Sequence, residues 1–402
     1  MIKKFKQFVA SEYGWLPFLF SGLVIARVLG FNVGPVELVA NVVFILLAVK
    51  LMASRIRFDN LLLCFLLYIP ISLIIADPNP VFNSWMRYGF FVLLLLVVSP
   101  LLQNAKARYF RSRVFKASLF FCILIAAVSF VCYFLGINMM RNTYSGGELD
   151  YIQNTAGTFG GLTSQSMLLG PISGVALVAC TYVALQSGKK VFWGLAVMCA
   201  GSLLFAASRS SLIATVLAEI CLFYFSSKNK GLVLKRFLLV LLVSASTIPF
   251  WGGALEGITA KNKGSIESGV NLDSRGEKWS FRIEEWKSSP LFGIGFVAVS
   301  DRDNYTLDGG IEPGSSWLAL LSMTGIFGFL FFVVLFFRGI KRSLLRQTPM
   351  GALVGSLLVL LGVHMFAEGH IFSGGSYLCF LVWLVLGSAI DYEPEKQVIK
   401  TI

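Results

Sequence analysis

The sequence predicts an all-α, polytopic integral membrane protein with about twelve transmembrane helices and one large extracytoplasmic loop. Three observations favour this fold class: 56% of the 402 residues are hydrophobic, only 14% are charged, and the mean hydropathy is +0.76. A soluble chain carries about 25% charged residues, whereas a helix that spans a membrane needs roughly 20 apolar residues. The composition therefore excludes a soluble enzyme, a secreted disulfide scaffold and a disordered chain.

The apolar runs follow one another closely, and we expect a single membrane domain over residues 1–402. The first run begins like a signal peptide, but no cleavage site of small residues follows it, so we expect it to remain as the first span. Residues 191–226 are too long for one helix across a hydrocarbon core of ~30 Å, and we expect two spans joined by a tight turn at Arg209. The predicted spans are 14–30, 33–53, 59–76, 84–103, 116–137, 165–187, 190–207, 210–226, 231–251, 314–337, 350–368 and 371–390.

Lysine and arginine gather in every second connection between the predicted spans. The other short connections hold only Arg27, Arg87, Arg141 and Arg209. Because basic residues mark cytoplasmic connections, we predict that both termini are cytoplasmic. We attribute the net charge of +13 to this orientation and to contact with anionic headgroups, and not to nucleic-acid binding.

One connection is large. Residues 252–313, between the ninth and tenth spans, are predicted to form an extracytoplasmic loop, and a second polar segment, 138–164, lies on the same side. The cytoplasmic face carries only short basic turns, so we expect any chemistry to face outward, which excludes ATP and nucleotide sugars as substrates. The chain has no Walker loop, no His-Glu-x-x-His and no Cys-x-x-Cys. We predict neither a metal site nor a cofactor.

Two arginines on the predicted outer side are candidates for binding an anion. Arg209 precedes two serines that can cap a helix, and a guanidinium at a helix N-terminus suits a phosphate; the alternative is an arginine that snorkels to the headgroups. Arg282 and Trp286 are four residues apart, which places both on one face of a short helix that Pro290 ends. An amphipathic helix on the membrane interface explains this second pattern equally well.

Three ionisable residues on the same side are further candidates. Glu312 ends the large loop and can accept a proton in catalysis, or is a solvated residue near a helix start. Glu368 and His370 lie in the last outer turn, where His370 can act as a base or bind phosphate when protonated. His364 is better explained as a histidine packed in the core.

Aromatic side chains on this side are candidates for glycan binding. Tyr144, Tyr151 and Trp317 can stack against sugar rings, and Glu368 is grouped with them as a residue for binding glycan. A belt of aromatic residues at the membrane interface explains the three rings equally well.

Several stretches, in this order along the chain, resemble the O-antigen polymerase/ligase family, which comprises Wzy-type polysaccharide polymerases and O-antigen ligases. They are Ser208-Arg209-Ser210 at the tight turn, Arg282-x-x-x-Trp286-x-x-x-Pro290-Leu-Phe-Gly293-x-Gly295 in the large loop, and residues 317–328 in the following span. A weaker match covers residues 157–166. The resemblance extends over roughly residues 155–390, and the first half of the chain matches only in being hydrophobic.

The resemblance implies a GT-C-like fold. It also implies a metal-independent glycosyltransferase that acts at the outer face of a bacterial plasma membrane and uses polyprenyl-pyrophosphate-linked donors. The donor would be a sugar chain on undecaprenyl pyrophosphate. Arg209 and Arg282 occupy the positions that the family uses to neutralise this leaving group. The implied partners are undecaprenyl-pyrophosphate-linked oligosaccharides, membrane lipids and a chain-length regulator.

One departure from the family bears on the acceptor. Family ligases commonly carry a histidine near the end of the outer loop, where this chain has Glu312 followed by Pro-Gly-Ser-Ser. This difference favours a polymerase of lipid-linked repeat units of O-antigen, capsule or exopolysaccharide. The proton acceptor is then Glu312 or His370, or proton removal is unassisted. Two alternatives remain: an O-antigen ligase that transfers glycan to lipid A core, and a transporter or flippase of lipid-linked sugars.

Overall fold

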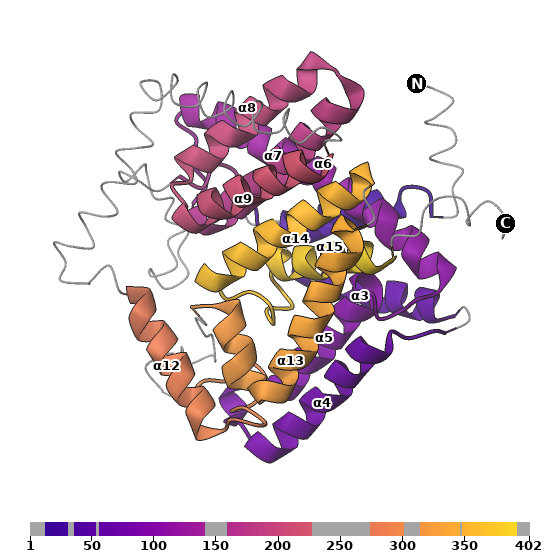
Figure 1. Ribbon diagram of the computed structural model, residues 1–402, viewed down its shortest axis with the longest axis vertical. Helices are drawn as coiled ribbons and strands as arrows, with labels where there is room; N and C mark the ends of the chain where they lie inside the picture. Colours follow the sequence, from indigo (N-terminus) through magenta and orange to yellow (C-terminus); the bar gives the residue numbers. More distant parts are fainter. Residues whose placement is uncertain are drawn as a thin grey trace.

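The computed structural model shows a bundle of helices (Figure 1). Within the residues that it describes, the only β-type pairings are isolated bridges, between Leu29 and Thr163 and between Phe58 and Leu102. The prediction of an all-α membrane protein is confirmed at this level. The described residues are 13–30, 36–53, 56–140, 159–226, 274–300, 314–345 and 348–391.

Eleven helices in the described residues coincide with predicted spans, and the ninth predicted span, 231–251, lies outside them. By length and composition, six are long and apolar enough to cross a membrane: α5 with the preceding turn η1, α6, α7, α9, α13 and α14. The count of twelve spans therefore stays a prediction. The bounds are α2 Leu16–Ala26, α3 Val36–Met52, α4 Asn60–Ala76, η1 Pro80–Phe82, α5 Ser84–Val98, α6 Ala105–Phe134, α7 Ser166–Ser187, α8 Lys190–Phe205, α9 Arg209–Ser226, α12 Ser274–Ser288, α13 Ser316–Leu344, α14 Pro349–Ala367 and α15 Tyr377–Asp391.

Helix α6 begins eleven residues before the predicted span, which started at residue 116. The side chain of Asn104 accepts a hydrogen bond from the backbone N–H of Ala107 and caps the helix. The basic stretch 106–116 is therefore the first three turns of a helix and not a loop. The charged residues that limited the predicted span are compatible with a helix that extends beyond the membrane.

Helix α13 is not the single continuous span that the sequence predicted. The backbone of Gly325 leaves the helical region with φ 62° and ψ −171°, so the helix consists of two segments that meet at an angle (Figure 1). The segment after the break, 326–344, has the length of a full span, whereas the segment before it is short. A glycine in an apolar run, such as Gly325, does not by itself predict a break in a helix.

The C-terminal helices form the centre of the bundle. In Figure 1, α14 and α15 lie between the group α7–α9 and the group α3–α5. The side chain of Trp383 on α15 is fully buried and packs against Phe65, Phe91 and Phe332 from three other helices. Large apolar side chains on the outside of the bundle are exposed, among them Leu19, Leu46, Val49, Ile74 and Phe337. Such a surface suits lipid tails and not water.

Two ion pairs join helix ends on the side that the sequence predicts to be cytoplasmic. Arg111, which is fully buried, contacts Asp391 at 2.5 Å and so ties α6 to α15. Arg338 pairs with Asp59 and ties the end of α13 to the start of α4. These pairs fix the positions of helices that are distant in the sequence.

Candidate functional site

The segment Pro290–Gly295 fills the break in α13. The backbone N–H groups of Ile294 and Gly295 donate to the carbonyls of Ser322 and Met323 at 2.9 and 3.2 Å, and the N–H of Ile326 donates to the carbonyl of Pro290 at 2.9 Å. Backbone groups that a broken helix leaves unpaired are costly in an apolar medium. This segment of the large loop supplies their partners and is thereby anchored in the bundle.

Helix α4 holds the same segment from the other side. The hydroxyl of Tyr68 donates to the carbonyl of Leu291 at 2.7 Å and contacts that of Thr324 at 2.9 Å. The hydroxyl of Ser72 donates to the carbonyl of Phe292 at 2.6 Å. The junction thus joins three parts of the chain: α4, the loop after α12 and α13.

Two glycines are required at this junction. Both have positive φ, 74° at Gly293 and 62° at Gly325. A Cβ at Gly325 would lie 2.2 Å from the carbonyl oxygen of Leu291, and one at Gly293 would lie 2.5 Å from the backbone of Met323. Gly293 of the loop motif and Gly325 in the following span therefore serve one contact between two backbones.

Arg282 lies on α12 and is buried, with 2% of its surface exposed. Its guanidinium contacts the carboxylate of Glu285 at 2.7 Å and also donates to the carbonyl of Ala298. Glu285 in turn accepts from the backbone N–H of Ser300 at 2.8 Å. Burial lowers the pKa of Arg282, and Glu285 counteracts that effect. Arg282, which the sequence predicts to bind pyrophosphate, is thus held in an ion pair with Glu285. This pair fastens α12 to residues 298–300.

Arg209 has different surroundings. It is the first residue of α9 and is exposed. The turn before it places Ala207 at φ 48°, a conformation that is unfavourable for a residue with a Cβ. The hydroxyls of Ser208 and Ser211 lie 2.8 Å apart. The predicted tight turn between two helices is therefore present, and it directs Arg209 outward at a helix N-terminus.

Helix α9 packs along α14 in the opposite direction. Thr215 of α9 and Leu360 of α14 both approach Gly174, and further along Cys221 of α9 lies beside Ser356. Continued toward the start of α9, this register places Arg209 at the level of the C-terminal end of α14. The turn that carries Glu368 and His370 begins at that end.

Hydrogen bonds from the start of α13 hold this last turn. The hydroxyl of Ser316 donates to the carbonyl of Glu368 at 2.7 Å and accepts from the N–H of His370 at 2.9 Å. His370 is 4% exposed, and its ring lies 5.4 Å from that of His364, which is fully buried. Burial, together with the neighbouring His364, lowers the pKa of His370 well below 6.5. His370 is therefore neutral at pH 7.

Trp317 lies between α13 and α14. Its indole N–H donates to the carbonyl of Gly362 at 2.9 Å, and its ring contacts Phe332, Phe336 and Phe366. These contacts give Trp317 a role in helix packing, and sugar stacking by its ring stays a prediction. Glu312, Tyr144 and Tyr151 lie outside the described residues.

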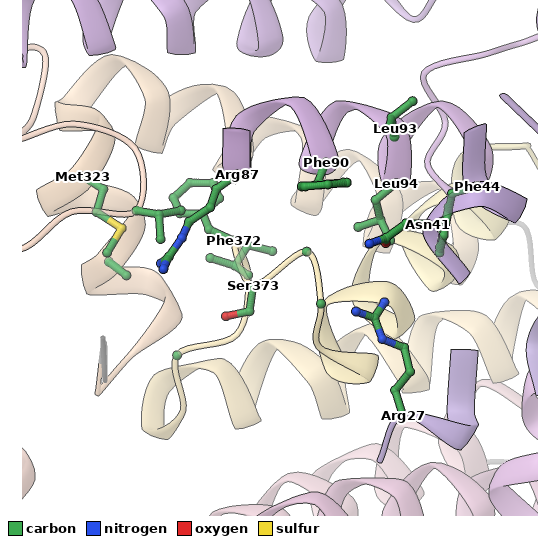
Figure 2. A pocket seen from close by; sticks show the side chains of 16 residues that line it. Arg27, Asn41, Phe44, Arg87, Phe90, Leu93, Leu94, Met323, Phe372 and Ser373 are labelled. Atoms are coloured by element: carbon green, nitrogen blue, oxygen red, sulfur yellow. The ribbon is translucent and has the colours of Figure 1, made fainter. Parts of the chain in front are cut away.

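A cavity of about 380 Å³ opens where the ends of several helices meet the last turn (Figure 2). Arg27 follows α2, and Arg87 lies in the first turn of α5; Figure 2 shows them on opposite sides of the turn that carries Ser373. Sequence reasoning did not select either arginine, because no motif contains them. The available signal was their occurrence on the side of the membrane where arginine is scarce.

The fold and these features define a polytopic helical membrane protein in which a loop segment is built into a broken helix and several arginines lie at helix ends. Residues 194–333 match the family model described as O-antigen ligase, which confirms the resemblance to an O-antigen polymerase/ligase-like family over that segment. The matched segment contains Arg209, Arg282 and the junction at Gly325. No curated protein matches the chain.

Proposed function

We propose that this protein is a glycosyltransferase that polymerises lipid-linked oligosaccharide repeat units at the outer face of a bacterial plasma membrane. The donor is a growing glycan on undecaprenyl pyrophosphate, and the acceptor is a sugar hydroxyl of an incoming lipid-linked unit. The observation that carries the proposal is the match to the O-antigen ligase family over the segment that holds both Arg209 and Arg282. Both termini are cytoplasmic in the proposed orientation.

The chemistry requires neutralisation of a leaving group. The acceptor oxygen forms a bond to the anomeric carbon of the donor, the bond from that carbon to the pyrophosphate breaks, and the lipid pyrophosphate departs with an additional negative charge. Cationic groups that are already in place stabilise such a charge. Arg209 supports this role because it is exposed at the N-terminus of α9, where backbone N–H groups also attract anions.

Arg282 takes part in one of two ways. If Glu285 releases it, its guanidinium becomes available to the pyrophosphate. If the pair stays closed, Arg282 positions the loop by fixing α12 to residues 298–300. Both roles depend on the side chain of Arg282. Substitution of its partner Glu285 distinguishes them.

The proton of the acceptor hydroxyl goes to Glu312 or His370. The neutral form of His370 is the form that accepts a proton, but its ring is buried. Glu312 precedes the capped start of α13. It is close in sequence to Ser315, which donates to the carbonyl of Met365 near the end of α14, and to Ser316, which holds the last turn. We propose Glu312 as the acceptor of the proton.

Purified protein in liposomes with a lipid-linked oligosaccharide tests the proposal. A ladder of products longer by whole repeat units is the expected result. Transfer to added lipid A core without a ladder would identify a ligase. Movement of the substrate across the bilayer without new glycosidic bonds would overturn the enzymatic proposal in favour of a transporter.

A further inference from the structure

Glu219 is a carboxyl group in the middle of a predicted span. Among the described helices α2–α9 and α13–α15, it is the only aspartate or glutamate that lies more than one residue from a helix end. It follows Arg209, the first residue of α9, by ten residues. This separation is about 15 Å along the helix, near the centre of a hydrocarbon core of ~30 Å. An ionisable side chain at this depth is costly and usually has a function.

The carboxyl group has a hydrogen-bond partner at only one of its two oxygens. The hydroxyl of Thr181 on α7 donates to Oε1 of Glu219 at 3.0 Å. Oε2 is buried, and within the residues that the structure describes it has no hydrogen-bond partner. An ionised carboxylate in an apolar medium requires compensation of its charge and hydrogen bonds at both oxygens. These contacts therefore suit a neutral carboxylic acid better than a carboxylate.

The described helices that pack against α9 carry no cationic side chain near their middle. These helices are α7, α8 and α14, and α7 and α14 contain no lysine, arginine, aspartate or glutamate. Besides Glu219, the charged residues of α8 and α9 are Lys190 and Arg209, each the first residue of its helix. The other titratable side chains of these four helices are Cys180, Tyr182, Cys199, Cys221, Tyr224 and His364. Because a nearby cation is what favours an ionised carboxylate in such a place, the neutral form of Glu219 is favoured here.

The contact between α7 and α9 is tight one turn away from Glu219. Ser211 and Thr215 precede Glu219 at intervals of four residues and share its face of α9. A Cβ at Gly174 of α7 would lie 2.3 Å from the hydroxyl oxygen of Thr215, and one at Gly170 would lie 2.8 Å from that of Ser211. Small residues of this kind allow two helix backbones to approach closely in a membrane. A charge on Glu219 could be hydrated only if the two helices moved apart.

We propose that Glu219 is a proton-binding site within the membrane and that its proton keeps α7 and α9 packed together. Release of the proton breaks the O–H bond of the carboxyl group, transfers the proton to water and leaves a carboxylate between the two helices. Water then hydrates the carboxylate, the helices separate, and the start of α9 is displaced together with the turn at Arg209. The inference goes beyond the proposed function, which gives Glu219 and α7 no role, and it does not depend on the reaction that the protein catalyses.

Infrared spectroscopy of the purified full-length protein in detergent tests whether the site holds a proton, because a protonated carboxyl has a C=O stretching band that a carboxylate lacks. We expect this band at pH 7 in the wild type and its loss in Glu219→Gln. Thr181→Val should shift the band without removing it, since the hydrogen bond to Oε1 is lost. Glu277→Gln, at an exposed carboxyl of α12, is the matched control and should leave the band unchanged. A spectrum at pH 7 without a band that depends on Glu219 would overturn the proton site.

Labelling with a carbodiimide distinguishes a proton from a metal cation as the ligand. Dicyclohexylcarbodiimide is apolar and reacts with protonated carboxyl groups, so at pH 7 it should label Glu219 and not Glu277 in protein reconstituted into liposomes. Mass spectrometry of peptides measures the extent of labelling at each residue. We expect equal labelling of Glu219 in sodium chloride and in choline chloride. Protection by sodium would overturn the proton assignment in favour of a site for a sodium ion.

Cross-linking between α7 and α9 tests the effect of the proton on helix packing. A Cβ built at Gly174 lies 3.5 Å from the Cβ of Thr215, a separation at which disulfides form. In a variant without the seven native cysteines, Gly174→Cys together with Thr215→Cys should cross-link at pH 7 equally fast with and without Glu219→Gln.

As the pH is raised, the cross-linking rate with Glu219 should fall relative to the rate in the Glu219→Gln background, because only the carboxyl can lose a proton. The ratio of the two rates cancels the titration of the thiols themselves. A ratio that does not change with pH would overturn the effect of the proton on packing. The infrared measurement introduces no cysteine and decides the proton site by itself if the double-cysteine variant fails to fold.

Discussion

The resemblance assigns Arg209 and Arg282 the same role, binding of the pyrophosphate, but the two side chains differ in their exposure to solvent. Arg209 is exposed at a helix start, whereas Arg282 is buried against Glu285. Removal of one partner from a buried ion pair leaves an uncompensated charge, which costs about 3–5 kcal/mol. The same substitution therefore has different physical consequences at the two positions.

We expect Arg209→Ala to abolish long glycan chains without lowering the melting temperature, and Arg282→Ala to lower both. Arg209→Lys should restore activity only in part, because the charge remains but the bidentate geometry is lost. Gel analysis of glycan length and thermal unfolding of the purified variants measure the two effects. Glu285→Gln separates the roles of Arg282: retained transfer indicates that Arg282 acts on the pyrophosphate, whereas loss of both stability and transfer indicates positioning by the pair. Normal chain length in Arg209→Ala would show that this arginine only snorkels.

Glu312→Gln should slow transfer by about 10²–10⁴-fold, the usual contribution of general-base assistance, while donor binding survives. The substitution keeps the shape of the side chain and removes its charge. His370→Ala should have a smaller effect on the rate because the ring is buried beside His364. Initial rates of bond formation at saturating donor make the comparison. An active Glu312→Gln with an inactive His370→Ala would assign the proton acceptor to the last turn.

His370 also predicts a dependence of stability on pH. Its folded-state pKa lies well below its ordinary value of 6.5, because burial and His364 disfavour the charged ring. The unfolded chain therefore binds a proton that the folded protein does not as the pH falls below 6.5, and stability is lost in that direction. We expect the melting temperature to fall between pH 7.5 and pH 5, and to fall less in His370→Asn. An equal fall in both proteins would show that other groups cause it.

At the scale of elements, the apolar runs predicted the helices well, since eleven helices in the described part of the chain coincide with predicted spans. The early start of α6 was missed because its first turns carry the charges of residues 106–116. The break in α13 was missed for another reason: Gly325 adopts φ 62° only because Pro290–Gly295 supplies the hydrogen bonds that the helix loses. Contacts between distant segments cannot be derived from local periodicity.

The junction predicts a strong effect for a small substitution. Gly325→Ala places a Cβ 2.2 Å from the carbonyl oxygen of Leu291 and strains a positive φ, so we expect little folded protein. Gly194→Ala is the matched control, because, among the residues that the structure describes, no atom outside its own helix lies within 4 Å of a Cβ built there. Removal of a helical glycine there should be neutral or stabilise by up to about 1 kcal/mol. The yield of monodisperse protein and the melting temperature of the two variants test this expectation. A normal yield and melting temperature for Gly325→Ala would contradict the close backbone contact.

At the scale of the whole molecule, the candidate site combines what the sequence showed with what only the fold shows. The motifs around Arg209 and Arg282 were visible as short patterns in the second half of the chain. The cavity was not, because it brings Arg27 and Arg87 from the first half to the turn at Ser373. Neither arginine lies in a motif, and their proximity to that turn depends on how α2, α3, α5 and α13 pack around it.

The outward orientation of this site is the prediction on which the proposed chemistry depends. In a variant without the seven cysteines, a thiol reagent that does not cross membranes should label Ser373→Cys in intact cells but not Ser112→Cys. Both serines are exposed in the fold, so accessibility to water alone does not separate them. Ser373 lies in the turn at the cavity, whereas Ser112 lies among the basic residues at the start of α6.

Val270→Cys, in the predicted large loop, should be labelled as Ser373→Cys is. After permeabilisation all three variants should react, which shows that each thiol is reactive. Labelling of Ser112→Cys in intact cells would reverse the orientation, place the arginines and the cavity in the cytoplasm, and remove the reason for excluding nucleotide sugars as donors.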